Sequence, residues 1–239
     1  MRQSLSGLIF LAVLAISARS SVSAQDLGGG GVATKENLDL PFDAIGDNEE
    51  EEDAPEIVTF YGQQLEGDGL FYAVDHSGSM NDSGELQVAK RELVRNITEF
   101  SERVQFGIVF FDANVKKFPN SGMPADANPG MKSVAISWVN SIPAGHGSCC
   151  QQGIVAALQI ANRASSKRKV LVYLGDGGGT CQGADESVYL KACLSAVSAQ
   201  NYSRIQINTI AILNPAPLNI DFLKRLASSN GGTYTRVTR

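Results

Sequence analysis

Three short stretches of the sequence place oxygen-bearing side chains beside apolar segments. FYAVDHSGSM sets Asp75, Ser77 and Ser79 at the end of an apolar run. GHGSCC carries Ser148 ahead of a helical pattern, and GDGGGT carries Asp176 behind the apolar run VLVYL. Hard divalent cations such as Mg²⁺ take oxygen ligands, and Mg²⁺ demands octahedral geometry. If the stretches converge, their carboxylates and hydroxyls form a site for Mg²⁺, or for Mn²⁺ or Ca²⁺.

The spacing within DHSGS suits such a site. Alternate residues of an extended turn aim Ser77 and Ser79 the same way, while Gly78 keeps the position between them free of bulk. A carboxylate at a sheet edge is costly to desolvate unless a cation or hydrogen bonds compensate it. Two neighbouring carboxylates also repel each other, and a bound cation relieves that repulsion. These considerations favour a metal site over an ordinary polar turn.

An enzyme is the alternative interpretation of the same residues. A metal-assisted hydrolase would use Asp75, His76 and the site serines, but a catalytic histidine must reach a serine. Alternation along the turn is expected to aim His76 away from the ligands. The glycines of GDGGGT resemble a phosphate-binding loop, yet no Lys-Ser or Lys-Thr pair follows them. The spacing His-x-x-Cys-Cys fits no common zinc pattern. On these residues alone, a binding module and a metal-assisted enzyme both remain open.

The elements that position these residues follow an alternating pattern from Pro55 onward. LFYAVD, VQFGIVFF and VLVYL are apolar almost throughout, as expected of strands covered on both faces. A short charged strand at 114–118 suits a sheet edge. The pattern predicts an α/β fold: a doubly wound, Rossmann-like, mostly parallel sheet with one short antiparallel edge strand and helices on both faces. The other expected elements are strands at 205–213 and 233–237 and helices at 83–100, 131–140, 151–164, 185–199 and 220–229, the last capped by Asn219.

The stretch DxSxS at the end of the first strand resembles the metal-ion-dependent adhesion site of von Willebrand factor type A domains. The resemblance covers roughly residues 55–239 and includes the closing segment FLKRLASSNGGTYTRV. In that family a Thr from a second loop and an Asp from a third complete the site. The Asp matches Asp176 in LGDG. The Thr position falls on Ser148, placed by its distance to Gly153 and the helix IVAAL, with Thr180 as the substitute.

The resemblance implies a metal-dependent binding module for adhesion or scaffolding and not an enzyme. Asp75, Ser77 and Ser79 would ligate Mg²⁺ directly or nearly so, and Ser148 and Asp176 would ligate it directly or through water. One coordination position would stay open. A protein partner would fill that position with an acidic side chain, so that its binding depends on the metal.

The composition divides the chain into three parts. Residues 1–24 hold an apolar run behind Arg2 and end in small residues, as in a cleaved signal peptide. Residues 25–54 contain GGGG and DNEEEED and carry ten acidic residues against one Lys, which predicts a flexible linker. Residues 55–239 carry seventeen Lys and Arg against fifteen Asp and Glu and form the expected type A domain. We expect a bacterial-type exported protein, secreted or held in the periplasm or cell envelope.

This division also bears on partners. No segment after the signal peptide is long and apolar enough to span a bilayer, so we expect no transmembrane segment in the mature chain. The folded part is close to neutral and lacks a strong basic field, so nucleic acid is not an expected partner.

Four cysteines suggest disulfide bonds in an exported chain. Cys181 lies five residues after Asp176, in a loop that should neighbour the Ser148 loop. A bond from Cys149 or Cys150 to Cys181 would tie the two loops together. Cys193 lies in a helical pattern, where a free buried thiol is the simplest expectation.

Overall fold

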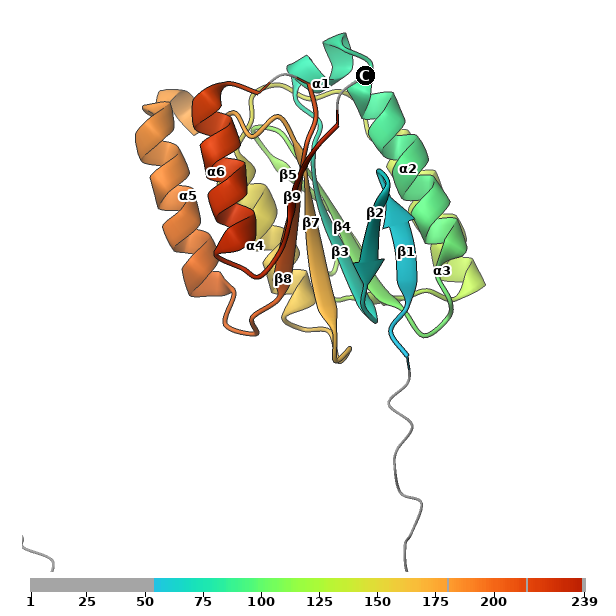
Figure 1. Ribbon diagram of the computed structural model, residues 1–239. Coiled ribbons are helices and arrows are strands. Elements are labelled where there is room, and N and C mark those ends of the chain that lie inside the picture. The colour runs from blue at the N-terminus through green and yellow to red at the C-terminus, as the bar shows by residue number, and fades with distance from the viewer. Residues whose placement is uncertain (1–53, 180, 214, 238–239) are drawn as a thin grey trace, which may run out of the picture. The chain divides into compact units, whose positions relative to one another are not determined.

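The computed structural model describes residues 54–179, 181–213 and 215–237. The expected signal peptide and all but the last residue of the expected linker lie outside these ranges. Within them the chain forms a mostly parallel sheet with helices on both faces (Figure 1). The α/β fold class predicted from the sequence is therefore confirmed.

The central sheet consists of β3 (Gly69–Asp75), β4 (Gln105–Phe111), β5 (Val115–Phe118), β6 (Ala125–Asp126), β7 (Lys169–Gly175), β8 (Gln206–Ala211) and β9 (Tyr234–Arg236). The order is β5-β4-β3-β7-β8-β9, and β6 pairs with β4. All neighbours run parallel except β5 and β6, which lie antiparallel to β4. The short charged segment 114–118 thus forms the antiparallel edge that its composition predicts.

Seven helices are described: α1 (Gly78–Asp82), α2 (Glu85–Glu99), α3 (Pro129–Ser141), α4 (Cys150–Ala161), the 3₁₀ turn η2 (Cys181–Gly183), α5 (Glu186–Gln200) and α6 (Pro217–Ser228). Side chains of α2 and α3, such as Leu93 and Val139, pack on one face of the sheet. Side chains of α4, α5 and α6, such as Ile154 and Leu223, pack on the other (Figure 1). Because both faces are covered, the central strands are apolar along almost their whole length.

The starts of the helices follow ordinary capping chemistry, with one correction to the sequence prediction. Asp185 caps α5 by accepting a hydrogen bond from Val188 N at 3.1 Å. Asn219 does not cap the last helix, as its sequence position suggests. That helix begins at Pro217, and Asn219 lies buried within its first turn. Proline favours the first helical position, because its fixed φ suits a helix and its missing N–H has no intrahelical partner to lose there.

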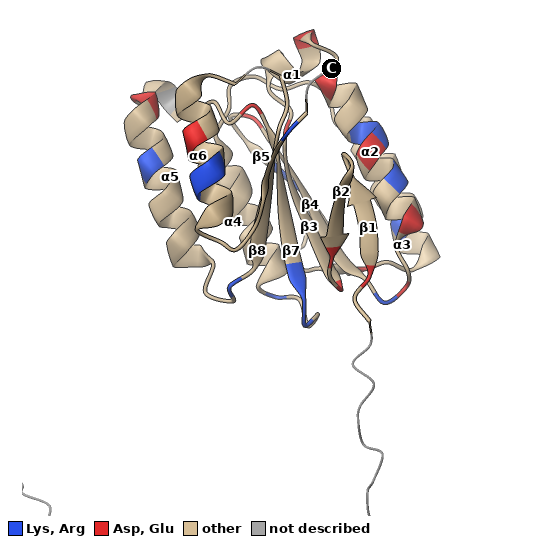
Figure 2. Ribbon diagram, viewed as in Figure 1, with Lys and Arg blue, Asp and Glu red and all other residues tan. Residues whose placement is uncertain are grey.

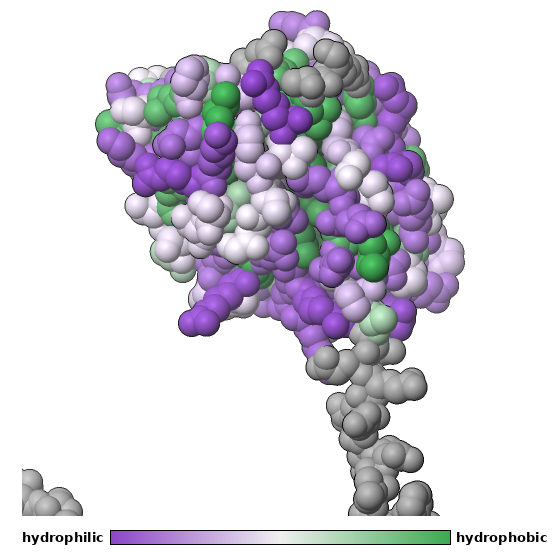
Figure 3. All heavy atoms as spheres, in the orientation of Figure 1, coloured by the Kyte–Doolittle hydropathy of each residue, from purple (hydrophilic) through white to green (hydrophobic). Residues whose placement is uncertain are grey.

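The described surface carries charges of both signs and scattered apolar side chains. Acidic and basic residues lie side by side along α2 and α6, and α5 carries one segment of each sign (Figure 2). Separate apolar spots interrupt the polar surface on the face shown in Figure 3. The exposed large apolar residues belong to different parts of the chain: Ile57, Met123, Val134, Val188, Tyr202 and Leu218. Within the described residues, no helix has the length of apolar sequence needed to cross a bilayer.

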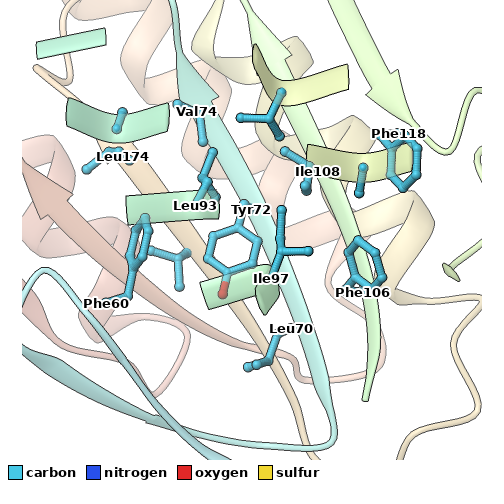
Figure 4. Close-up of a cluster of buried hydrophobic side chains, with 14 of the residues drawn as sticks. Phe60, Leu70, Tyr72, Val74, Leu93, Ile97, Phe106, Ile108, Phe118 and Leu174 are labelled. Carbon is cyan, nitrogen blue, oxygen red and sulfur yellow. The ribbon is translucent and has the colours of Figure 1, made fainter. Parts of the chain in front are cut away.

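A β-hairpin that the sequence prediction lacks precedes the sheet and packs on its α2 side. Its strands are β1 (Ile57–Phe60) and β2 (Gln63–Glu66). The Phe60 ring meets Tyr72 edge-on, with centroids 5.2 Å apart, in the same cluster as Leu93 (Figure 4). The Tyr72 hydroxyl donates to Asn96 Oδ1 at 3.0 Å, and Asn96 Nδ2 donates to Thr59 O at 2.6 Å. The hairpin therefore covers apolar sheet surface and satisfies buried polar groups.

Candidate metal site

The carboxyl ends of β3 and β7 lie side by side, and this adjacency brings the predicted ligands together. Asp75 is the last residue of β3, and Asp176 directly follows β7. A continuous series of contacts then joins Ser148 to Asp75, Asp75 to Ser77, Ser77 to Ser79 and Ser79 to Asp176. The three loops singled out in the sequence thus converge on one place.

Asp75 is fully buried at the base of this place. Its Oδ1 accepts a hydrogen bond from Ser77 N at 2.7 Å, and its Oδ2 accepts one from Ser148 Oγ at 3.1 Å. Burial raises the pKa of the Asp75 carboxyl to about 7, and the nearby charge of Asp176 adds to this rise, while the hydrogen bonds from Ser77 and Ser148 oppose it. A cation near this carboxylate would stabilise its charged form.

The oxygens above Asp75 have the spacing of neighbouring ligands around a small cation. Ser77 Oγ lies 3.1 Å from Ser79 Oγ, and Ser79 Oγ lies 3.1 Å from Asp176 Oδ2. Octahedral Mg²⁺ with ligands about 2.1 Å away sets adjacent oxygens about 3.0 Å apart. Among the described residues, no group of three or more His, Cys, Asp or Glu side chains is arranged to hold a metal. A cation held here would therefore depend on the serine hydroxyls as well as the two aspartates, and this oxygen donor set fits Mg²⁺.

The loop after β7 owes its shape to Gly177. This residue has φ +72°, a conformation that glycine adopts without strain. The turn lets Gly178 N donate to Asp176 Oδ1 at 2.9 Å, which leaves Oδ2 for Ser79. The Gly178 carbonyl in turn accepts a hydrogen bond from Ser148 Oγ at 3.0 Å. The glycine-rich stretch thus positions Asp176 and joins the second loop to the third.

The loop that carries Ser148 is held by Asp112, which sequence analysis did not single out. The backbone carbonyl of Asp112 accepts from Cys149 N at 2.8 Å, and its side-chain Oδ2 accepts from His146 N at 3.2 Å. Partial burial raises the pKa of the Asp112 carboxyl, but the hydrogen bonds from Asn114 N and His146 N outweigh burial, so that this pKa is lowered. Asp112 follows β4, so a third parallel strand supports the site.

A disulfide bond joins Cys149 to Cys181 and links the Ser148 loop with the segment after Asp176. The structure thus confirms that Cys181 is bonded to one of the two adjacent cysteines. Cys150 and Cys193 are buried and free, as expected for Cys193. Thr180, the substitute for Ser148 in the resemblance, lies outside the described residues.

His76 turns away from the ligands, as alternation predicts. Its side chain is buried, with Nδ1 2.9 Å from Pro143 O and Nε2 3.8 Å from Asp112 Oδ1. Burial lowers the pKa of the His76 imidazole. Within the described residues no hydrogen bond joins His76 to a site serine, so His76 does not form the histidine–serine pair of a hydrolase.

Four of the five predicted ligand residues, all but the buried Asp75, line an open cleft of about 410 Å³. The cleft also contains a carboxylate missing from the sequence prediction. This carboxylate belongs to Glu186, the first residue of α5, and its Oε1 accepts a hydrogen bond from Gly179 N at 3.2 Å. Glu186 follows a glycine-rich loop and a capping aspartate, and this position in the sequence could have indicated a carboxylate near the site. The cleft is lined by Ser77, Gly78, Ser79, Gly147, Ser148, Asp176, Gly178, Gly179 and Glu186.

Comparison with solved structures finds the same fold in other proteins. A von Willebrand factor type A protein from Catenulispora acidiphila has a TM-score of 0.63 at 16% identity, over 78% of this chain and 46% of that one. The pilus adhesin SpaC from Lactobacillus rhamnosus GG has a TM-score of 0.58 at 15% identity, over 74% of this chain and 28% of that one. The von Willebrand factor domain of the type V pili tip protein Mfa5 from Porphyromonas gingivalis has a TM-score of 0.57 at 12% identity, over 71% and 89%.

The likeness is one of fold and not of sequence. The chain spans less than half the length of the first two of these proteins. No protein-family profile matches it, and no curated protein sequence does. The strand order, the helices on both faces and these structural neighbours together establish that the described part of this chain has the fold of a von Willebrand factor type A domain.

Proposed function

We propose that this protein is an exported adhesion or scaffolding module that binds a protein partner through a divalent cation. The residues that would hold the cation are Asp75, Ser77, Ser79, Ser148 and Asp176. Bound there with one coordination position open, Mg²⁺ would bridge to an acidic side chain of the partner. The periplasm, the cell envelope or the exterior is the proposed location.

The observation that carries this proposal is the convergence of four oxygen-bearing side chains around the buried carboxylate of Asp75. Asp75 accepts hydrogen bonds from Ser77 and Ser148, and no residue lining the described cleft is basic. A buried carboxylate without a basic partner is costly unless a cation approaches it. The serines supply neutral oxygens that add no further negative charge. Such a site suits reversible capture of a carboxylate better than covalent chemistry.

The structural neighbours support the adhesion part of the proposal. SpaC is a pilus adhesin, and Mfa5 is a pili tip protein. This chain shares their fold, and the likeness does not extend to the partners that they bind. For this chain, binding in place of catalysis is further supported by the orientation of His76, whose ring nitrogens face Pro143 and Asp112.

Calorimetric titration of Mn²⁺ and Mg²⁺ into the full chain tests the cation site, with Asp75→Ala as the matched variant. Residues 47–53 are strongly acidic, and any cation binding by this segment is the same in the variant, which retains it. The binding that disappears in Asp75→Ala is therefore the binding at the site. Identical titrations for the two proteins would overturn the proposal.

The open coordination position is tested with acetate as the carboxylate probe. Protein-bound Mn²⁺ should speed the relaxation of the acetate methyl protons in the wild type and lose this effect in Asp75→Ala. Mn²⁺ binding at the site without acetate relaxation would mean that the cation is fully enclosed, and would overturn the partner-binding part of the proposal.

A further inference from the structure

The cleft holds one carboxylate more than the five predicted ligand residues provide. Glu186 is the first residue of α5, and its side chain lines the cleft together with Asp176 and the site serines. It comes from a helix that supplies none of the five ligands. It is therefore an additional carboxylate beside those of the DxSxS stretch and of the loop after β7.

The Glu186 carboxylate lies close to that of Asp176. The point where a Cβ on Gly178 would stand lies 3.3 Å from Asp176 Oδ1 and 3.7 Å from Glu186 Oε1, so these two oxygens are at most about 7 Å apart. Glu186 is half-buried, and its Oε1 accepts a hydrogen bond from Gly179 N. The carboxylate is thereby held at the rim of the cleft.

The charges in the cleft do not balance once Glu186 is included. A divalent cation is neutralised by the carboxylates of Asp75 and Asp176 alone. Glu186 adds a third negative charge, and no Lys or Arg is among the residues lining the described cleft. The third charge attracts the cation and repels an incoming carboxylate, with an effect that the open, solvated cleft reduces but does not abolish.

We propose that Glu186 is a specificity-determining residue of this site: its carboxylate strengthens cation binding and weakens the binding of an acidic partner to the bound cation. This inference rests on the proposed function. It implies that Glu186 repels an acidic partner that approaches the open side of the cation. A partner that also brings a basic group to Glu186 is the kind that fits this cleft.

Glu186 also holds the glycine-rich loop, and the two roles can be separated by the choice of substitution. Glu186→Gln keeps an oxygen that accepts from Gly179 N while it removes the negative charge. Glu102→Gln makes the same chemical change in an exposed turn just before the amino end of β4. The site lies at the carboxyl ends of the strands, so this variant is the matched control.

The experiment measures two affinities in the full chain of each variant. Mn²⁺ affinity is taken from calorimetry, with the binding that survives in Asp75→Ala subtracted. Acetate affinity is taken from methyl-proton relaxation, with each variant saturated with Mn²⁺. In Glu186→Gln we expect Mn²⁺ to bind about five-fold more weakly and acetate about five-fold more tightly. Glu102→Gln should match the wild type in both.

Opposite shifts in the two affinities support the inference, because a loop that merely loses its shape weakens both. Glu186→Gln with both affinities unchanged, or both lowered, overturns it while leaving the cation site itself in place. If wild type and Asp75→Ala bind Mn²⁺ alike, the proposed function fails and the role of Glu186 fails with it.

Discussion

At the scale of single residues, Asp75 is the site residue whose charged form is most strongly disfavoured by burial. It is fully buried, and its hydrogen bonds from Ser77 and Ser148 do not prevent burial from raising its pKa to about 7. The position suits a cation ligand and is unfavourable for a carboxylate alone. Replacing Asp75 is therefore expected to change both the affinity for the cation and the unfolding free energy of the metal-free protein.

We predict that Asp75→Asn stabilises the metal-free protein above neutral pH. In wild type the folded pKa lies above that of the unfolded chain, so stability is full below about pH 4 and falls as the pH rises to about 7. Asparagine stays neutral and can still accept from Ser77 N. The difference in unfolding free energy between Asp75→Asn and wild type should widen by roughly 2 kcal/mol between about pH 5 and about pH 8.

Urea unfolding in the presence of a chelator measures this difference. Parallel stability profiles for the two proteins would show that Asp75 does not titrate in this range. The same variant should lose the Mn²⁺ binding that Asp75→Ala loses. Together the two results would show that the Asp75 carboxylate lowers the stability of the metal-free protein and is needed to bind the cation.

At the scale of elements, the site depends on loops whose positions are fixed by contacts outside the sheet. The Ser148 loop is joined to Asp112 by hydrogen bonds and to Cys181 by the bond from Cys149. The bond closes a loop that contains α4 and β7. It therefore constrains two ligand-bearing segments relative to each other.

We predict that removing this bond weakens both stability and cation binding. Cys149→Ser together with Cys181→Ser should cost about 3 kcal/mol in unfolding free energy, because the unfolded chain gains the entropy of a long open loop. Mn²⁺ affinity should fall as well, since Ser148 and Asp176 lose a shared constraint. Cys193→Ser, which removes a free thiol of α5, is the control for Mn²⁺ affinity only, because a hydroxyl at this buried position is itself destabilising. Unchanged Mn²⁺ affinity in the double variant would show that the hydrogen bonds suffice.

The hairpin is the second element with a testable role. Phe60 is fully buried against Tyr72, and without it a cavity would open between the hairpin, α2 and the sheet. Phe60→Ala should lower the unfolding free energy by about 3–5 kcal/mol. Ile57→Ala, at an exposed position of the same strand, should change it by less than about 0.5 kcal/mol. Similar losses for both variants, measured by urea unfolding, would contradict this role for the hairpin.

At the scale of the whole molecule, the cation should couple to folding. The ligands come from segments after β3, before α4 and after β7, and only the folded chain brings them together. A ligand that binds the native state alone stabilises it by mass action.

We predict that Mg²⁺ at about a hundred times its dissociation constant stabilises the protein by about 2.7 kcal/mol and raises Tm by about 5–10 °C. Thermal unfolding monitored by circular dichroism measures the shift. Asp75→Ala should show no such rise, and an equal ionic strength of sodium chloride serves as the control for screening. An equal rise in wild type and variant would place the effect outside the site.

The sequence by itself determined the fold class and predicted five site residues, which the structure brings together. Continuous apolar runs such as VQFGIVFF are what strands covered on both faces require, and parallel strands end at one edge, where Asp75 and Asp176 stand. These features depend on local composition and on general rules of sheet topology. The pairing of Cys181 with one of two adjacent cysteines followed from the same neighbourhood of loops.

Only the tertiary structure decided the rest. The strands of the hairpin have four residues each, too few for their alternation to stand out, and they are stabilised by Tyr72 and Asn96. The choice of Cys149 over Cys150, the support from Asp112 and the presence of Glu186 in the cleft depend on contacts between residues far apart in the sequence. Such contacts leave no periodic pattern in the sequence, because they depend on how the folded chain brings distant segments together and not on local residue preferences.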